Sequence, residues 1–149
     1  MSPKRRKIQK VLSLREKALD QRALELAQSR ETLEQAKREH LLESERLLAA
    51  ATRRRELSSG RVDIGSWIES EQWLRQRQQD LYRADGRVAE ANATVCDALH
   101  GVVAAQIDKR RIELLDQHLA DGELRRENAV EQRLTDELAR RRRPPSDGD

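Results

Sequence analysis

Cys96 and His100 are the two side chains that come closest to forming a chemical site, because thiolate and imidazole groups are both common zinc ligands. They lie four residues apart, so both would project from one face of a helix. Two ligands do not hold a zinc ion, however, and the sequence offers no second pair at ligand spacing. We therefore interpret both as solvent-facing residues and expect no metal and no cofactor.

The sequence contains no motif typical of an enzyme. It has no glycine-rich phosphate loop and no nucleophile motif, and its pattern lacks the mixture of strands and helices that usually builds a pocket. His40 falls on a heptad position, where we interpret it as a tolerated polar layer rather than a pH sensor. We predict that the protein is not an enzyme.

A basic run near the start of the chain consists of Lys4, Arg5, Arg6 and Lys7. Followed by leucines seven residues apart, it imitates the basic region and zipper of a bZIP protein. A DNA-binding basic region needs a longer helix bearing arginine and asparagine, whereas here a mixed-charge segment follows at once. A solvated helix end is the commoner interpretation of such a run, and we expect no nucleic-acid partner.

The composition predicts an all-α protein without a compact core. Of the 149 residues, 38% are charged, 36% are hydrophobic, 2% are aromatic and none is Phe. Disorder is the competing interpretation, but the net charge is only +3 and the apolar residues are periodic. The single Cys96 excludes a disulfide within the chain, and without a signal peptide or an apolar span we expect a cytoplasmic protein with no membrane insertion.

The feature that organises the chain is a turn between two periodic segments. Its turn-forming residues are Ser58, Ser59, Gly60, Asp63 and Gly65. Ser66 and Glu69 have the spacing of a capping box, which predicts that a helix restarts at Trp67. We therefore expect the turn over residues 58–66.

Heptad spacing runs through both segments. The first has Leu12, Leu19, Leu26, Leu33, His40 and Leu47 at one position, and Arg15, Arg22, Ser29, Ala36, Glu43 and Ala50 three residues later. These two positions together form the seam, the stripe along which a helix packs against its partner. Because half of the seam is polar or small, the helix would pair poorly with a copy of itself. The second segment offers a complementary seam, with Trp67, Leu74, Leu81, Val88, Val95 and Val102 at one position and Ala84, Ala91, Ala98 and Ala105 at the other.

An antiparallel pairing matches the two seams. Its predicted facing pairs are Leu47 with Leu74, Leu33 with Val88, Leu26 with Val95 and Leu19 with Val102. Its charged contacts are Arg15 over Ala105 and Arg22 over Ala98, through their methylene stems, and Glu43 against Arg77. We predict an elongated two-helix antiparallel coiled-coil hairpin that forms a single stalk over residues 1–149.

The limits of the two helices follow from their capping signals. Ser2 and Pro3 suit the N-cap and first helical position of a helix over about residues 3–57. A later start at a second capping box, Ser13 with Glu16, would instead leave the basic run as a flexible arm. We expect the second helix over about residues 67–141, longer than the first, with a kink or break permitted at residues 121–122 and a disordered tail over residues 142–149.

Trp67, Ile68 and Trp73 form the sharpest motif of the chain, a Trp-Ile pair followed five residues later by an aromatic. This motif resembles the start of the second helix in the FliJ family of flagellar export proteins. The chain length, the glycine-containing turn near residue 60 and the longer second helix with a basic tail are also similar to that family, and to its injectisome relatives of the YscO type. The resemblance extends over essentially the whole chain, and both a flagellar and an injectisome system fit it.

The resemblance implies a cytoplasmic stalk protein of type III export, peripherally associated with the inner-membrane apparatus. Its open end would insert into the central hole of a hexameric export ATPase, through Arg5, Arg6, Lys7, Ile8, Leu12, Leu124, Arg125, Arg126, Leu134 and Leu138. Its second helix would contact the export gate, a membrane protein, through Trp73, Arg77, Asp80 and Ala84. Export chaperones are further partners that the resemblance allows.

Several alternatives stay open at this point. Trp67 and Trp73 could pack with Val62 and Ile64 to cap the turn; we favour this for Trp67, and for Trp73 both roles are open. The protein could also be a structural adaptor, although the arginine-rich first seam argues against self-pairing, or a chaperone of export substrates. The apolar Leu124, Leu134 and Leu138 have no partner within the hairpin, which suggests docking elsewhere.

Overall fold

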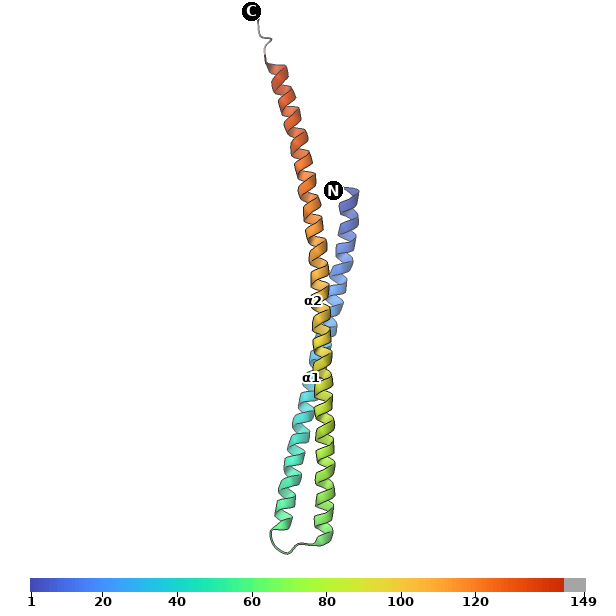
Figure 1. Ribbon diagram of the computed structural model, residues 1–149, viewed down its shortest axis with the longest axis vertical. Coiled ribbons are helices and arrows are strands. Elements are labelled where there is room, and N and C mark those ends of the chain that lie inside the picture. Colours follow the sequence, from blue (N-terminus) through green and yellow to red (C-terminus); the bar gives the residue numbers. More distant parts are fainter. Residues whose placement is uncertain (144–149) are drawn as a thin grey trace, which may run out of the picture. The chain divides into compact units, whose positions relative to one another are not determined.

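The computed structural model describes residues 1–143, which form two helices and no strand over that range. Helix α1 spans Pro3–Ser58 and helix α2 spans Ile64–Arg142 (Figure 1). The all-α fold with a longer second helix is thus confirmed. Of the predicted tail, Arg142 still belongs to α2, and residues 144–149 lie outside the described residues. Within residues 1–143, neither helix is long and apolar enough to cross a membrane.

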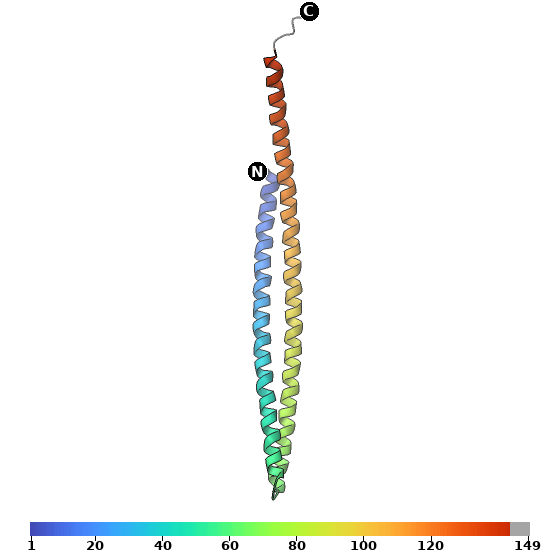
Figure 2. The same ribbon diagram turned by 90° about the vertical axis from the view of Figure 1, so that its left-hand side faces the viewer.

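The contacts of the chain fall into two compact units. One comprises residues 20–104 and is called the turn unit here; the other comprises residues 1–19 with residues 105 onward and is called the open-end unit. Within each unit, a segment of α1 lies beside a segment of α2 and runs in the opposite direction (Figures 1 and 2). Antiparallel pairing of the two helices therefore holds in each unit.

The core of the turn unit follows the two predicted seams. Leu33, Ala36 and Ala91 form a buried cluster, and Val88 and Val95 pack against it. Leu33 and Val88 thus share one cluster, as their predicted pairing requires. The other buried apolar residues of this unit are Leu26, Ala50, Leu74, Ala84 and Val102. Small alanines between the larger side chains let the two backbones approach closely.

The predicted contact between Glu43 and Arg77 is replaced by pairs within each helix. Glu43 accepts from Arg46 at 2.8 Å, and Arg77 pairs with Asp80 at 2.9 Å. Neighbours three residues apart are brought together by the helix itself, whereas a cross-helix pair must order two long side chains. Glu43 Oε2 and Arg77 Nε stay buried without a hydrogen-bond partner among residues 1–143.

The two arginines of the first seam have further neighbours on α2 besides the predicted alanines. The Cδ atom of Arg22 lies 3.5 Å from the point where a Cβ of Gly101 would sit, so its stem covers the helix one turn beyond Ala98. In the open-end unit, Arg15 lies 3.9 Å from Asp108. A glycine has no side chain to displace the stem of Arg22, and a carboxylate attracts Arg15 more strongly than an alanine methyl group does.

The loop between the helices is shorter than predicted and covers residues 59–63. Gly60 has a φ of 118°, in a region that side-chain-bearing residues rarely adopt. This glycine lets the chain reverse within five residues.

Asp63, not Ser66, caps the second helix, which corrects the predicted capping box and moves the helix start from Trp67 to Ile64. Asp63 Oδ1 accepts from the Gly65 N–H at 3.2 Å, and the Asp63 carbonyl accepts from the Trp67 N–H at 2.9 Å. The Ser66 hydroxyl donates to Asp63 Oδ2 at 2.9 Å. A carboxylate has two acceptor oxygens and a negative charge that the helix N-terminus favours, so it caps better here than a hydroxyl.

The first helix begins at Pro3, as the Ser2-Pro3 pair predicted. Ser2 Oγ accepts from the Arg5 N–H at 3.3 Å and serves as the N-cap. The basic run is therefore helical, and the alternative start at Ser13 is not used.

Candidate partner-binding sites

Helix α2 continues past the first residues of α1 as an unpaired segment. The Ser2 N–H donates to Glu123 Oε1 at 3.2 Å, and residues 124–142, called the overhang here, extend beyond this contact (Figure 2). The helix passes through Asp121 and Gly122 without the break that their types permitted. Every residue of the overhang is exposed.

The overhang carries an apolar stripe along one side. Its members are Leu124, Val130, Leu134 and Leu138, each between 54% and 56% exposed. Val130, Leu134 and Leu138 follow one another at four-residue spacing and therefore lie on one helix face. Three of the four were among the predicted partner-binding residues; Val130 was not, although the same spacing would have identified it. The basic Arg125 and Arg126 are exposed beside the stripe.

The N-terminal candidate residues separate into two groups. Arg6 and Lys7 are exposed. Ile8 and Leu12 are half-buried, because both lie on the seam with α2. Only the first group is free to meet a partner while the two helices are paired.

Arg5 belongs to neither group, because side chains of α2 hold it in a cluster that we call the open-end clamp. Arg5 Nε donates to Asp116 Oδ1 at 3.0 Å and Arg5 Nη2 donates to Asp116 Oδ2 at 3.4 Å. Arg5 Nη1 donates to Glu123 Oε2 at 3.4 Å, and Gln9 Nε2 donates to Asp116 Oδ2 at 2.8 Å. The Ser2 N–H completes the clamp through Glu123. A two-bond fork of this kind is the strong form of an arginine–carboxylate pair.

The charges of the clamp reinforce one another. The hydrogen bond to Asp116 raises the pKa of Arg5 above its ordinary value. Hydrogen bonds from Ser2, foremost from its side chain, and then from Arg5 lower the pKa of Glu123. The clamp therefore favours the charged forms of both Arg5 and Glu123.

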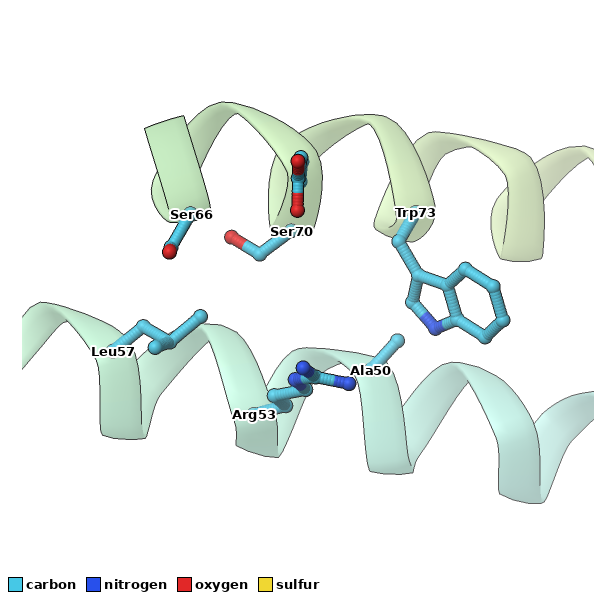
Figure 3. Close-up of a pocket in the computed structure, with 7 residues that line it drawn as sticks. Ala50, Arg53, Leu57, Ser66, Ser70 and Trp73 are labelled. Atoms are coloured by element: carbon cyan, nitrogen blue, oxygen red, sulfur yellow. The ribbon is translucent and has the colours of Figure 1, made fainter. Parts of the chain in front are cut away.

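The second candidate site lies in the turn unit beside Trp73. Its indole is 54% exposed and forms one wall of a cavity of about 200 Å³ between α1 and α2 (Figure 3). The remaining lining residues are Ala50, Arg53 and Leu57 from α1 and Ser66, Glu69 and Ser70 from α2. In Figure 3 the indole extends toward Ala50, and Ser66 and Ser70 face α1 across the cavity. Because an apolar cavity of about 150 Å³ can hold benzene, this one has room for one large apolar side chain of a partner.

The other three predicted gate-binding residues are largely covered. The Arg77 guanidinium stacks on the Trp73 ring, 4.7 Å from its centroid, and pairs with Asp80. Ala84 is only 1% exposed, in the seam where its heptad position had already placed it. Of the four residues, Trp73 alone offers a large exposed surface, and Arg77 with Asp80 orients its ring.

Trp67 is half-buried at the start of the seam. The guanidinium of Arg54 lies 5.4 Å from its ring centroid and pairs with Glu71 at 2.9 Å. Val62 and Ile64, which were expected to cover the tryptophans, are themselves exposed. Packing across the helix pair is thus the role of Trp67, with an arginine as its neighbour.

The residues that first suggested metal chemistry, Cys96 and His100, lie four residues apart on α2. Cys96 and His100 are both exposed. The described part of the chain holds no group of three side chains that could bind a metal ion. His40 pairs with Asp85 across the two helices, which makes it a polar layer of the seam.

Comparison with known proteins identifies one family that matches the chain. The family described as "Flagellar FliJ protein" matches the chain over residues 4–143. This match includes both helices, the overhang, the open-end clamp from Arg5 onward and the cavity beside Trp73. No curated protein and no solved structure matches the chain.

Proposed function

The chain belongs to the FliJ family of flagellar proteins, and on this premise we propose that it is the central stalk of the hexameric export ATPase and links this ATPase to the export gate. Its family is a structural component of flagellar export rather than an enzyme. In the proposed role the protein is cytoplasmic and associates peripherally with the inner-membrane export apparatus. It promotes assembly or turnover of the ring and hydrolyses nothing itself.

The observation that carries this proposal is the exposed apolar stripe of the overhang. A helix with one apolar face is a common way to dock into a partner's groove. Val130, Leu134 and Leu138 are each about half exposed, so their burial in a partner would contribute on the order of 1 kcal/mol apiece. A single helix, about 10 Å across with its side chains, also suits the central hole of a protein ring.

The exposed basic residues support an acidic partner surface. Arg125 and Arg126 lie beside the stripe, and Arg6 and Lys7 are exposed on α1 of the same unit. Such charges speed and orient association with an acidic surface, while the apolar contacts determine how long the complex lasts. We therefore propose that these four basic residues speed and orient the association with the ATPase, and that the apolar stripe holds the complex together.

We assign the contact with the export gate to Trp73 and the cavity beside it. The indole is exposed, its ring is held by Arg77, and the adjacent cavity can accept a side chain. Aromatic side chains beside a pocket are frequent centres of binding energy at interfaces. Trp73→Ala should therefore weaken binding to the gate protein and leave the ATPase contact unchanged.

The stalk assignment is tested by removing the stripe. The triple variant V130S/L134S/L138S should bind the cognate ATPase with about 100-fold lower affinity, because roughly 3 kcal/mol of apolar contact is lost. Co-elution with the ATPase should weaken accordingly. The variant should also abolish stimulation of ATP turnover. The matched control A129S/A139S alters exposed residues of the same overhang outside the stripe and should behave as wild type.

A second pair of variants separates the electrostatic contribution of the basic residues from the apolar contribution of the stripe. R125E/R126E should weaken the complex with the ATPase, and the loss should depend on salt concentration. R55E, which reverses an exposed charge in the last turn of α1, should not weaken the complex. If the wild-type protein neither co-elutes with the ATPase nor changes its turnover at low salt, the stalk assignment is wrong. A structural adaptor role would then take its place.

A further inference from the structure

We propose that the open-end clamp is an autoinhibitory latch, in which Asp116 and Glu123 occupy Arg5 until carboxylates of a partner compete for it. This inference rests on the proposed function, because it concerns regulation of the same ATPase-binding end. The partner's chemistry is an acidic surface that carries apolar side chains beside its carboxylates.

Arg5 is engaged within the chain through three of its five N–H donors. It makes a forked pair with Asp116 and a further hydrogen bond to Glu123, while its neighbours Arg6 and Lys7 are exposed. A carboxylate of a partner can pair with the Nε–Nη2 edge of Arg5 only by displacing Asp116, and it competes with Glu123 for Nη1. Asp116 and Glu123 thus occupy the positions that an acidic partner would take.

Apart from the clamp, few contacts hold the first turns of α1 against α2. None of the described residues of the open-end unit is buried, and the seam residues Ile8 and Leu12 are only half-buried. Four of the five clamp contacts are made by Arg5 or Gln9, and the fifth by the Ser2 amide. These ionic contacts are only partly buried, so salt and competing charges still reach and weaken them.

Opening of the latch would uncover further apolar residues of α2. Ile112 and Leu119 of α2 are half-buried on the seam of this unit, and the stripe of the overhang begins at Leu124. Release of residues 2–12 would expose Ile112 and Leu119 and lengthen the apolar surface of α2 from the overhang back by more than two turns. Opening of the latch therefore frees Arg5 and at the same time extends the apolar surface of α2 that would contact the partner.

The test is the double variant D116N/E123Q, which removes both acids and keeps their shapes. Hydrogen exchange on the full-length protein should show faster exchange for amides of residues 5–12, with no change in residues 20–104. The control D121N/E127Q changes the net charge equally at exposed acids outside the clamp and should leave exchange unchanged.

Binding to the ATPase decides between a latch and a merely structural clamp. A latch that is mostly closed lowers the apparent affinity by the fraction of open molecules, so D116N/E123Q should bind up to about tenfold tighter than wild type. D121N/E127Q, with the same net charge, should not. A merely structural clamp predicts no tighter binding: either weaker binding, because the site would lose its shape, or no change.

Three outcomes are distinguishable. If exchange in residues 5–12 does not change, or if wild type binds and D116N/E123Q binds no tighter, the latch is wrong and the stalk assignment stands. Binding by the double variant alone would support the latch and show that wild type is strongly inhibited. If neither protein binds, the stalk assignment fails and the latch fails with it.

Discussion

The turn unit and the open-end unit share heptad spacing but fill their seams differently. All buried side chains among the described residues belong to the turn unit: Leu26, Leu33, Ala36, Ala50, Ser70, Leu74, Ala84, Ala91 and Val102. In the open-end unit the seam is half-buried at most, and its specific contacts are the hydrogen bonds and ion pairs of the clamp and the pair of Arg15 with Asp108.

This difference separates permanent from adjustable pairing. Burial of an apolar side chain contributes about 1.5–3 kcal/mol and responds weakly to salt, whereas exposed ion pairs contribute little and are screened. We therefore expect the turn unit to hold the two helices together under all ordinary conditions. The open-end unit, where the ATPase is proposed to bind, is built to respond to its surroundings.

The largest expected effect is on the core of the turn unit. Leu26→Asp places a charge in the buried seam and should lower the free energy of unfolding by about 3–5 kcal/mol. Urea unfolding followed by circular dichroism measures this change. Leu24→Asp, two residues away and exposed, should cost less than about 0.5 kcal/mol. Equal costs for the two would mean that the seam is not where stability resides.

A smaller loss is expected at the most deeply buried alanine of the seam, Ala84. Ala84 is almost fully covered, so Ala84→Leu must push the backbones apart and should cost about 1–3 kcal/mol. Ala89→Leu, at an exposed position of the same helix, should be close to neutral. The same urea experiment compares them, and a neutral Ala84→Leu would contradict close packing in the turn unit.

A gain of about 0.5–1 kcal/mol is expected from replacing helical glycines by alanine. Gly86 in the turn unit and Gly122 in the open-end unit each have open space where a Cβ would sit. Gly86→Ala should raise the global unfolding midpoint, whereas Gly122→Ala should mainly slow hydrogen exchange near residue 122. Equal shifts of the midpoint would indicate that both units unfold together.

The smallest effect on global stability is expected from acidification of the clamp. The pKa of the Glu123 carboxyl group is lower in the folded protein than its ordinary value of 4.5. This group therefore stabilises the folded state fully at a pH above 4.5, and the contribution is lost as the pH falls through the folded-state pKa. Amides of residues 5–9 should therefore exchange faster than their intrinsic pH dependence predicts once the pH falls below 4.5. Glu123→Gln should remove the part due to this residue. An unchanged profile in E123Q would contradict its role.

The seams could be predicted from the sequence because periodicity alone determines which side chains face one another. Leu26, Leu33 and Val102 are buried where the heptads placed them. The helix start at Ile64 was missed because Asp63 and Ser66 are both good N-caps, and only the geometry shows which one is used.

The two sites were predictable to different degrees. The overhang follows from the unequal lengths of the periodic segments, so its leucines were identified correctly as unpaired. The clamp was not predictable, because a pair such as Arg5 with Asp116 depends on the rotamers of two long side chains across the helices. Ala84 shows a different error: its heptad position predicted burial, while the family resemblance implied a surface contact.

The position of the two tryptophans turns the protein into its own spectroscopic probe. Trp67 and Trp73 are the only tryptophans of the chain, and both lie in the first turns of α2 beside an arginine. Indole fluorescence therefore reports melting of the turn unit alone, whereas far-ultraviolet circular dichroism reports helix in both units. A dichroism signal that begins to fall at a lower temperature than the fluorescence signal would separate the two melting events in an unlabelled sample.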